Sequence, residues 1–146
     1  MVLKRRFEIL IVDDNIGDVV LTKEALEGAD RSNHVSVARD GFEALDFLRH
    51  AGKFSNAPRP NLVLLDINMP RKNGCEVLKE IRCDEKLRLI PVVIFTSSEA
   101  DDDICRAYEL GANCFITKPA DLDEMVKLVQ TTNHFWSNTV KLPRHS

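Results

Sequence analysis

Short apolar runs rich in valine and isoleucine alternate along this chain with longer stretches whose apolar residues recur at helical spacing. The runs predict strands at 8–12, 34–38, 62–66, 92–96 and 113–116. Strands that are apolar almost throughout are typical of parallel sheets buried on both faces, and parallel strands need crossover helices between them. The alternation therefore predicts an α/β fold, with a five-stranded parallel sheet flanked by five helices.

The predicted helices carry apolar stripes that we expect to pack on the sheet. The stripes are Ala44, Leu45 and Leu48; Val77, Leu78 and Ile81; Ile104, Ala107 and Tyr108; and Leu122, Met125, Val126 and Val129. Asp40 and Asp121 each precede a glutamate by three residues, which is the spacing of a capping box, and Gly111 stands where the fourth helix should end. The stretch 51–61 is predicted to be a longer loop before the third strand.

Charged side chains end or follow three of the predicted strands. Asp13 and Asp14 follow the first strand, Asp66 ends the third, and Lys118 follows the fifth. In a parallel sheet of order 2-1-3-4-5, ligands bind beyond the carboxyl ends of the strands, between strands 1 and 3. We therefore expect these four side chains to share one site.

Three crowded carboxylates need a positive partner. Two of them about 4 Å apart repel by roughly 4 kcal/mol at an effective dielectric constant of about 20, so the acids must bind a cation or take up protons. Mg²⁺, ahead of Ca²⁺, suits a few carboxylates and a phosphate. Thr96 ends the fourth strand and Ser97 follows it, and their hydroxyls, with Lys118, are donors for phosphoryl oxygens. Asp66 would be the nucleophile, because aspartyl phosphates are an established kind of covalent intermediate.

Composition argues against several other classes of protein. The 20 basic and 23 acidic side chains leave no basic footprint for nucleic acid or for an anionic membrane. No run approaches the roughly 18 apolar residues of a membrane span, and the apolar segment near the N-terminus is too short for a signal peptide. The four cysteines are too widely spaced for a CxxC motif and fit free thiols in a reducing compartment. We expect a cytoplasmic protein whose partners are proteins or small anions.

Taken together and in this order, the motifs resemble the receiver domain of two-component response regulators. The resemblance rests on the acidic pair after the first strand, the segment Asp66-Ile67-Asn68-Met69-Pro70-Arg71-Lys72-Asn73-Gly74, a threonine ending the fourth strand, and Lys118-Pro119 after the fifth. It implies a flavodoxin-like receiver fold in which Asp66 accepts a phosphoryl group. It also implies that Asp14, Asp66 and the backbone carbonyl of Asn68 ligate Mg²⁺, with Asp13 assisting through water.

The same resemblance implies a conformational switch. Thr96 and Lys118 would hold the phosphoryl oxygens, with a cis peptide bond between Lys118 and Pro119. Phe115 would be the switch aromatic, moving inward as Thr96 turns toward the phosphoryl group. The added charge would change the face built by the fourth helix, the fifth strand and the fifth helix.

A longer set of segments is similar to the single-domain response regulators that partner bacterial and cyanobacterial phytochromes. These segments are Asp14-Asn15, Asp18, Leu21-Thr22, Glu24-Ala25-Leu26, Ala57-Pro58-Arg59-Pro60, 112–119, Phe135-Trp136 and 140–143. The similarity implies a phytochrome-type sensor histidine kinase as phosphodonor, and a homodimer with Phe135 and Trp136 at an interface. We therefore expect one receiver domain over 1–146, with a core at about 7–133, an aromatic tail at 134–146 and no output domain.

Other interpretations of the same residues are possible. Taken singly, Asp66 is an ordinary turn acid, Lys118 a surface lysine and Phe115 a core residue. Phe135 and Trp136 fit either a local lid on the core or an exposed contact patch.

Two alternative functions use the same site. One is an aspartate-nucleophile, Mg²⁺-dependent phosphohydrolase. Members of that family carry the motif D-x-D-x-T, however, and Asn68 stands here in place of its second acid. The other is a degenerate receiver that only binds proteins, against which the complete set of acids, hydroxyl and lysine argues. We expect no enzyme in the usual sense, but a phosphoacceptor with self-catalysed phosphotransfer and slow autodephosphorylation.

Overall fold

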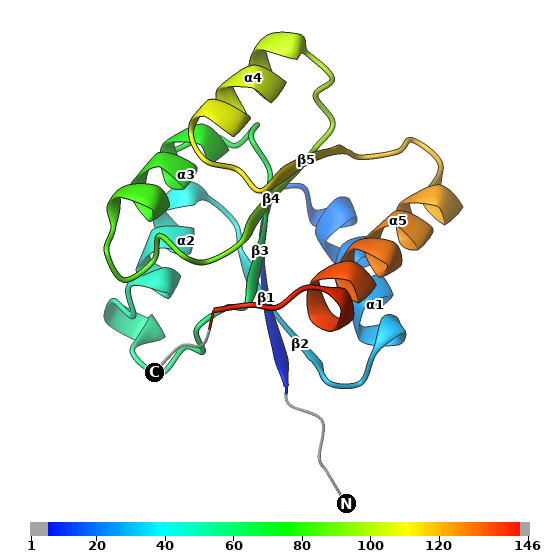
Figure 1. Cartoon of the computed structure of the whole chain (residues 1–146), viewed down its shortest axis with the longest axis horizontal. Helices are drawn as coiled ribbons and strands as arrows, with labels where there is room; N and C mark the ends of the chain where they lie inside the picture. The colour runs from blue at the N-terminus through cyan, green and yellow to red at the C-terminus, as the bar shows by residue number, and fades with distance from the viewer. Residues whose placement is uncertain (1–5, 144–146) are drawn as a thin grey trace, which may run out of the picture.

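The computed structural model describes residues 6–143, which contain one sheet of five strands (Figure 1). The strands are β1 (Phe7–Val12), β2 (Asn33–Ala38), β3 (Leu62–Leu65), β4 (Val92–Thr96) and β5 (Cys114–Thr117), in the order β2-β1-β3-β4-β5. All the pairings are parallel, so every strand ends at the same edge of the sheet. The predicted fold class and strand order are confirmed, and each strand limit is within one residue of its prediction.

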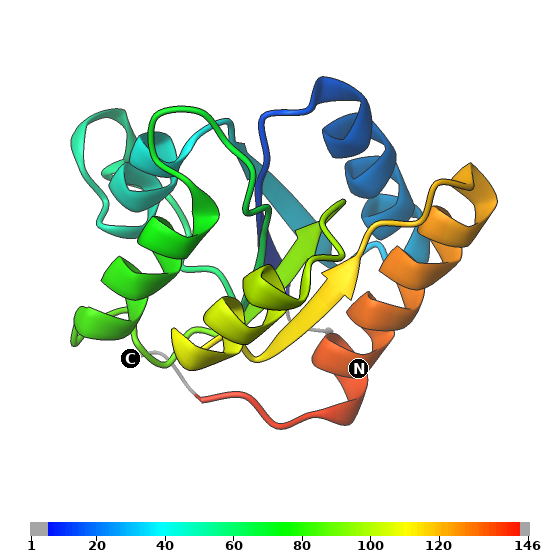
Figure 2. The same cartoon turned by 90° about the horizontal axis from the view of Figure 1, so that it is seen from above.

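Helices cover both faces of the sheet. They are α1 (Ile16–Ala29), α2 (Gly41–Leu48), α3 (Gly74–Cys83), α4 (Asp101–Glu109) and α5 (Leu122–His134), with a short 3₁₀ helix η1 (Gly52–Phe54) and a π-helical segment η2 (Phe135–Thr139). Figures 1 and 2 show α1 and α5 on one face, with α2, α3 and α4 on the other. The carboxyl edge of the sheet lies at the end of the molecule where α1 begins and where the loops that precede α3 and α4 run (Figure 2).

The core consists of two apolar clusters, one on each face of the sheet. Because successive side chains of a strand point to opposite faces, Leu10 of β1 belongs to the cluster beneath α2 and α3, and its neighbour Ile9 to the cluster beneath α1 and α5. Val63 and Leu64 of β3 divide in the same way. Each fully buried aliphatic side chain contributes about 1.5–3 kcal/mol, so the central strands are firmly anchored and fix the positions of their ends.

Most of the predicted helix features are confirmed. Asp40 and Asp121 each accept a hydrogen bond from a backbone N–H three residues later, at 2.9 Å, and Gly111 adopts φ +100° after α4. Two residues of the predicted apolar stripes are exposed instead, Tyr108 by 50% and Leu122 by 66%. They lie on α4 and at the start of α5, beside the edge strand β5, which is itself only half-buried and offers less surface to cover.

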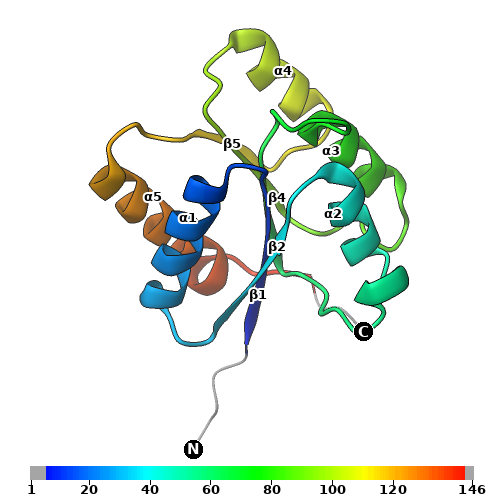
Figure 3. The ribbon, with the colours of Figure 1, turned by 180° about the vertical axis from the view of Figure 1, so that it is seen from behind.

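The chain after α5 crosses the sheet at the edge where the strands begin, opposite their carboxyl ends (Figures 1 and 3). Trp136 is half-buried and packs, with Leu142, against the cluster beneath α1 and α5. Phe135 is 48% exposed and meets the Trp136 ring edge to face at 5.6 Å. Trp136 therefore acts partly as a lid on the core, and Phe135 leaves an aromatic surface free; their predicted role in an interface stays a prediction.

No helix among residues 6–143 is long and apolar enough to cross a membrane.

Candidate functional site

The sheet itself places the first acids. The backbone N–H of Asp13 donates to Ala38 O at 3.1 Å and that of Asp66 donates to Val12 O at 2.9 Å, so both residues continue the ladders of the sheet. Asp13 and Asp66 are buried and Asp14 is exposed. One carboxylate oxygen of each residue lies within 4.8 Å of the other two. The structure thus brings the three predicted acids together at the switch point between β1 and β3.

A tight turn follows Asp66 and leads into α3. The N–H of Asn68 donates to Asp66 Oδ1 at 3.2 Å, and the N–H of Gly74 donates to Ile67 O at 3.0 Å. A Cβ atom at position 74 would lie 2.2 Å from the carbonyl oxygen of Asp66. Only glycine lets α3 begin this close to the acid, which explains the glycine that ends the Asp66–Gly74 motif.

Lys118 reaches into this group of acids. Its Nζ lies 2.6 Å from Asp13 Oδ2, 2.9 Å from Asp18 Oδ2 and 3.3 Å from Asp66 Oδ2, and its side chain is only 4% exposed. Burial by itself would lower the pKa of Lys118, but the hydrogen bonds to Asp13 and Asp18 and the charge of Asp66 outweigh burial and raise this pKa. The group is therefore an ammonium across the physiological pH range.

One ammonium does not balance the acids around it. Burial raises the pKa of Asp13, and the hydrogen bonds from Lys118 and from the Asn15 N–H offset that rise only in part. A carboxyl whose pKa is raised by folding destabilises the folded state once it ionises, so its cost is present at neutral pH and disappears as the pH falls through its folded-state pKa. A hard divalent cation would relieve this cost, and the clustered carboxylate oxygens are the ligands that such an ion prefers.

Hydroxyl groups complete the same edge. Thr96 is fully buried at the end of β4, and its Oγ1 accepts the N–H of Ser98 at 3.4 Å. The backbone N–H of Lys118 donates to Thr96 O at 2.7 Å, which places the two residues side by side. Ser97 is exposed. The Ser98 hydroxyl donates to Asp103 of α4 at 2.5 Å, so the loop that carries these residues is tied to that helix.

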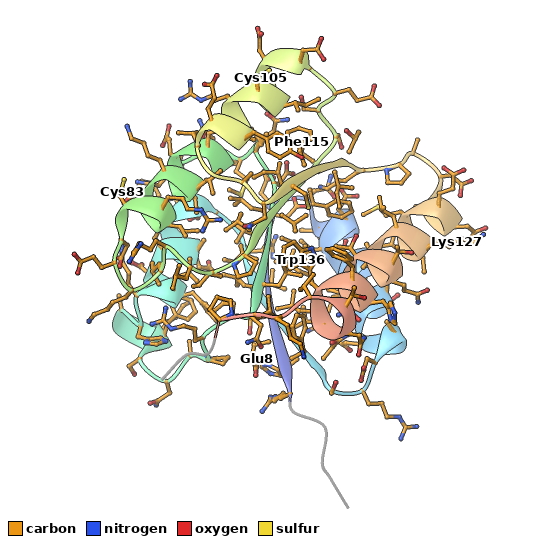
Figure 4. All side chains as sticks on the ribbon, in the orientation of Figure 1. Glu8, Cys83, Cys105, Phe115, Lys127 and Trp136 are labelled. Carbon is orange, nitrogen blue, oxygen red and sulfur yellow. The ribbon has the colours of Figure 1, made fainter. Side chains whose placement is uncertain are left out.

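Phe115 lies next to α4 (Figure 4) and is half-buried against the cluster beneath α2, α3 and α4. Its backbone N–H donates to the Oη of Tyr108 on α4, at 3.2 Å. Phe115 thus lies between β5 and α4, and its role as the switch aromatic stays a prediction.

The predicted cis peptide bond between Lys118 and Pro119 is wrong for this structure. No peptide bond within residues 6–143 is cis. The trans form of a bond before proline is intrinsically favoured by about 0.5–1 kcal/mol, and Lys118 reaches Asp13 with the bond trans.

Asp18 is the site residue that the sequence interpretation missed. It belongs to the segments that carry the subfamily resemblance, but no role was predicted for it. The available signal was weak, because an acid in the first turn of a helix is common for reasons of the helix dipole alone. Its contact with Lys118, 100 residues away, appears only in three dimensions.

Comparisons with known proteins agree with this geometry. Residues 9–130 match the family described as response regulator receiver domain. Response regulator Rcp1 of Synechocystis sp. is 44% identical over 135 residues, which cover 92% of this chain and 92% of that protein.

Two solved structures are similarly close. The phosphorylated cyanobacterial phytochrome response regulator RcpA has a TM-score of 0.92 at 43% identity, over 95% of this chain and 99% of that one. The Mn²⁺-bound form of response regulator Rcp1 has a TM-score of 0.89 at 43% identity, over 94% and 99%. On its sequence, its fold and the residues at the carboxyl edge of its sheet, the chain belongs to the response regulator receiver domain family.

Proposed function

We propose that this protein is a response regulator that accepts a phosphoryl group on Asp66 from a phosphohistidine of a sensor kinase, with Mg²⁺ as the metal. The observation that carries the proposal is the environment of Asp66, whose two carboxylate oxygens face different partners. Oδ2 faces the ammonium of Lys118, and Oδ1 faces the N–H of Asn68. The carboxylate is thereby oriented beside Asp13 and Asp14 rather than free to rotate.

In the proposed step, an oxygen of Asp66 forms a bond to phosphorus while the N–P bond of the phosphohistidine breaks. The bonding pair stays on the imidazole nitrogen, and the imidazole leaves neutral because its other nitrogen carries the proton. Lys118 and the Thr96 hydroxyl donate hydrogen bonds to phosphoryl oxygens, with Ser97 at the rim. Such transfers depend mainly on positioning and on stabilising the charge of these oxygens.

A bound Mg²⁺ would neutralise charge on the phosphoryl oxygens, held by Asp14, Asp66 and the carbonyl of Asn68, with Asp13 contributing through water. Slow autodephosphorylation is a second substitution at phosphorus, in which the Asp66 carboxylate is the leaving group. Water attacks, the bond to the Asp66 oxygen breaks with its electron pair on the carboxylate, and inorganic phosphate leaves.

The partners belong to the same proposal. RcpA is named as a phytochrome response regulator, and this supports a phytochrome-type histidine kinase as the phosphodonor. The exposed Phe135 ring and the half-buried Trp136 support a homodimer whose interface includes this aromatic pair. Exposed aromatic surface is often part of a protein contact.

Incubation with Mg²⁺ and acetyl phosphate, followed by intact mass measurement, tests the central step. We expect the protein to gain the mass of one phosphoryl group. Asp66→Asn should gain none, because its neutral amide cannot replace the carboxylate oxygen that attacks phosphorus. Asp46→Asn, which neutralises an exposed acid on α2, is the control and should gain the group normally. Absence of the gain in the wild type, or an equal gain in Asp66→Asn, would refute the assignment.

A second prediction concerns the switch. Phosphorylation is expected to shift the wild type toward the dimer in sedimentation velocity. Phe115→Ala is expected to gain the phosphoryl group normally but to lose most of that shift, because the side chain that moves between β5 and α4 is gone. Phe42→Ala, which removes an exposed ring on α2, should behave as the wild type does. An undiminished shift in Phe115→Ala argues against the switch, and monomers in both states argue against the homodimer.

A further inference from the structure

We propose that Asp18 is a positioning residue that, together with Asp13, holds the Lys118 ammonium in place for the phosphoryl group. The inference rests on the proposed function and adds a residue to it. Asp18 lies in the first turn of α1, where the side chain of Asn15 caps the helix by accepting the Asp18 N–H at 3.0 Å. The Asp18 backbone is therefore fixed, and its Oδ2 meets Lys118 Nζ at 2.9 Å.

The number of hydrogen-bond donors on Lys118 gives this contact its meaning. An ammonium has three N–H donors, and three carboxylates lie within 3.3 Å of it. The side chain is 4% exposed, so water has little access to the ammonium. A phosphoryl oxygen can gain a donor from Lys118 only if one of the three carboxylates gives one up.

The distances indicate which carboxylate this is. The contact with Asp66, at 3.3 Å, is the longest, compared with 2.6 Å for Asp13 and 2.9 Å for Asp18. Asp66 is also the acid whose oxygen forms the bond to phosphorus, after which its charge lies on the phosphoryl oxygens. Lys118 can then keep Asp13 and Asp18 as partners and turn its third donor from Asp66 to an oxygen of the new group.

Asp18 also limits how tightly Lys118 binds the nucleophile. Asp13 and Asp66 extend adjacent strands, whereas Asp18 approaches the ammonium from α1. Without the Asp18 carboxylate, attraction would draw the ammonium toward Asp66, and a closer ion pair would hold the lone pair that must attack phosphorus. The carboxylate of Asp18 therefore keeps the Lys118 ammonium near Asp66 but prevents a closer ion pair between the two.

A purely local role for Asp18 has a matched comparison within the chain. An acid in the first turn of a helix is favoured by the helix dipole wherever it occurs. Asp123 occupies the first turn of α5, and within the described part of the chain its side chain has no ion pair. Asp123→Asn thus removes a helix-dipole interaction of the same kind while leaving Lys118 untouched.

The test compares Asp18→Asn, Asp18→Glu and Asp123→Asn with the wild type. Initial phosphorylation rates at saturating Mg²⁺ are measured against acetyl phosphate concentration. We expect the maximal rate of Asp18→Asn to fall about tenfold, the size expected for one charge-assisted hydrogen bond, with the half-saturating concentration changed by less than about threefold, because binding of the donor is not the affected step. Asp18→Glu should recover part of the rate, and Asp123→Asn should stay close to the wild type.

A spectroscopic measurement on the unphosphorylated protein gives an independent readout. With ¹⁵N-labelled lysine, the Lys118 ammonium signal should move and exchange faster with water in Asp18→Asn, and stay unchanged in Asp123→Asn. An unchanged signal with an undiminished rate in Asp18→Asn would overturn the inference, as would an equal loss of rate in Asp123→Asn. If the wild type gains no phosphoryl group, the proposed function fails, and the ammonium signal alone then decides whether Asp18 holds Lys118.

Discussion

Replacing Lys118 by methionine is expected to lower the free energy of unfolding of the metal-free protein by about 3–5 kcal/mol, the range for removing one partner of a buried ion pair. Methionine keeps most of the apolar stem, so the loss reports the charge. The side chains of Asp13 and Asp66 are 6% and 9% exposed and would face each other without a cation. Because burial raises the pKa of Asp13 and losing the ammonium would raise it further, the cost of its charge, and with it the loss of stability, should shrink as the pH falls from 7 toward 4.

Added Mg²⁺ should return much of this stability to Lys118→Met, since an ion present at a hundred times its Kd stabilises the folded state by about 2.7 kcal/mol. Urea unfolding at several pH values, with Mg²⁺ and with a chelator, measures both effects. Lys127→Met is the control. Lys127 is exposed on α5 (Figure 4), and its loss should change stability by no more than about 0.5 kcal/mol. A Lys118→Met protein as stable as Lys127→Met at pH 7 would show that the ammonium does not stabilise these acids in the folded protein.

The expected loss in Lys118→Met could be foreseen from the sequence only in outline. Asp13, Asp66 and Lys118 each follow an apolar run, and the rule that parallel strands end at one edge was enough to bring them together. Their order along the chain then specified the family. The strand pattern does not determine the direction in which each side chain points. The hydrogen-bond partners of Lys118 therefore could not be predicted from the sequence.

Asp18 and Leu122 illustrate the two limits of the sequence reasoning. Asp18 was unassigned because its partner is 100 residues away and its local setting already explains an acid. Leu122 was predicted to be core from its helical spacing, but it is 66% exposed, at the start of α5 beside the half-buried edge strand β5. Spacing reports the face of a helix on which a residue lies and not how far the sheet extends beneath it. Features that depend on where one element ends against another therefore need coordinates.

Replacing Gly74 by alanine is expected to destabilise the protein by about 3 kcal/mol, at the upper end of the usual cost of overpacking, and to impair phosphorylation at the same time. The new Cβ would lie 2.2 Å from the carbonyl oxygen of Asp66 and 2.9 Å from the Cα of Ile67, both backbone atoms. Neither a rotamer change nor a flexible side chain can relieve contacts with backbone. The turn must open, and Asp66 moves with it.

The displacement of Asp66 is what separates Gly74→Ala from an ordinary destabilising change. A shift of about 1 Å in a reacting group can cost roughly a hundredfold in rate, so the phosphorylation rate should fall by that order at a temperature where the variant is still folded. Gly28→Ala is the matched control. An added Cβ there meets nothing within 4 Å, and the change should stabilise α1 by about 0.5–1 kcal/mol without altering phosphorylation. Thermal unfolding and the acetyl phosphate assay together decide the matter, because a Gly74→Ala protein that is less stable but phosphorylated at the normal rate would mean that the turn relaxes without moving Asp66.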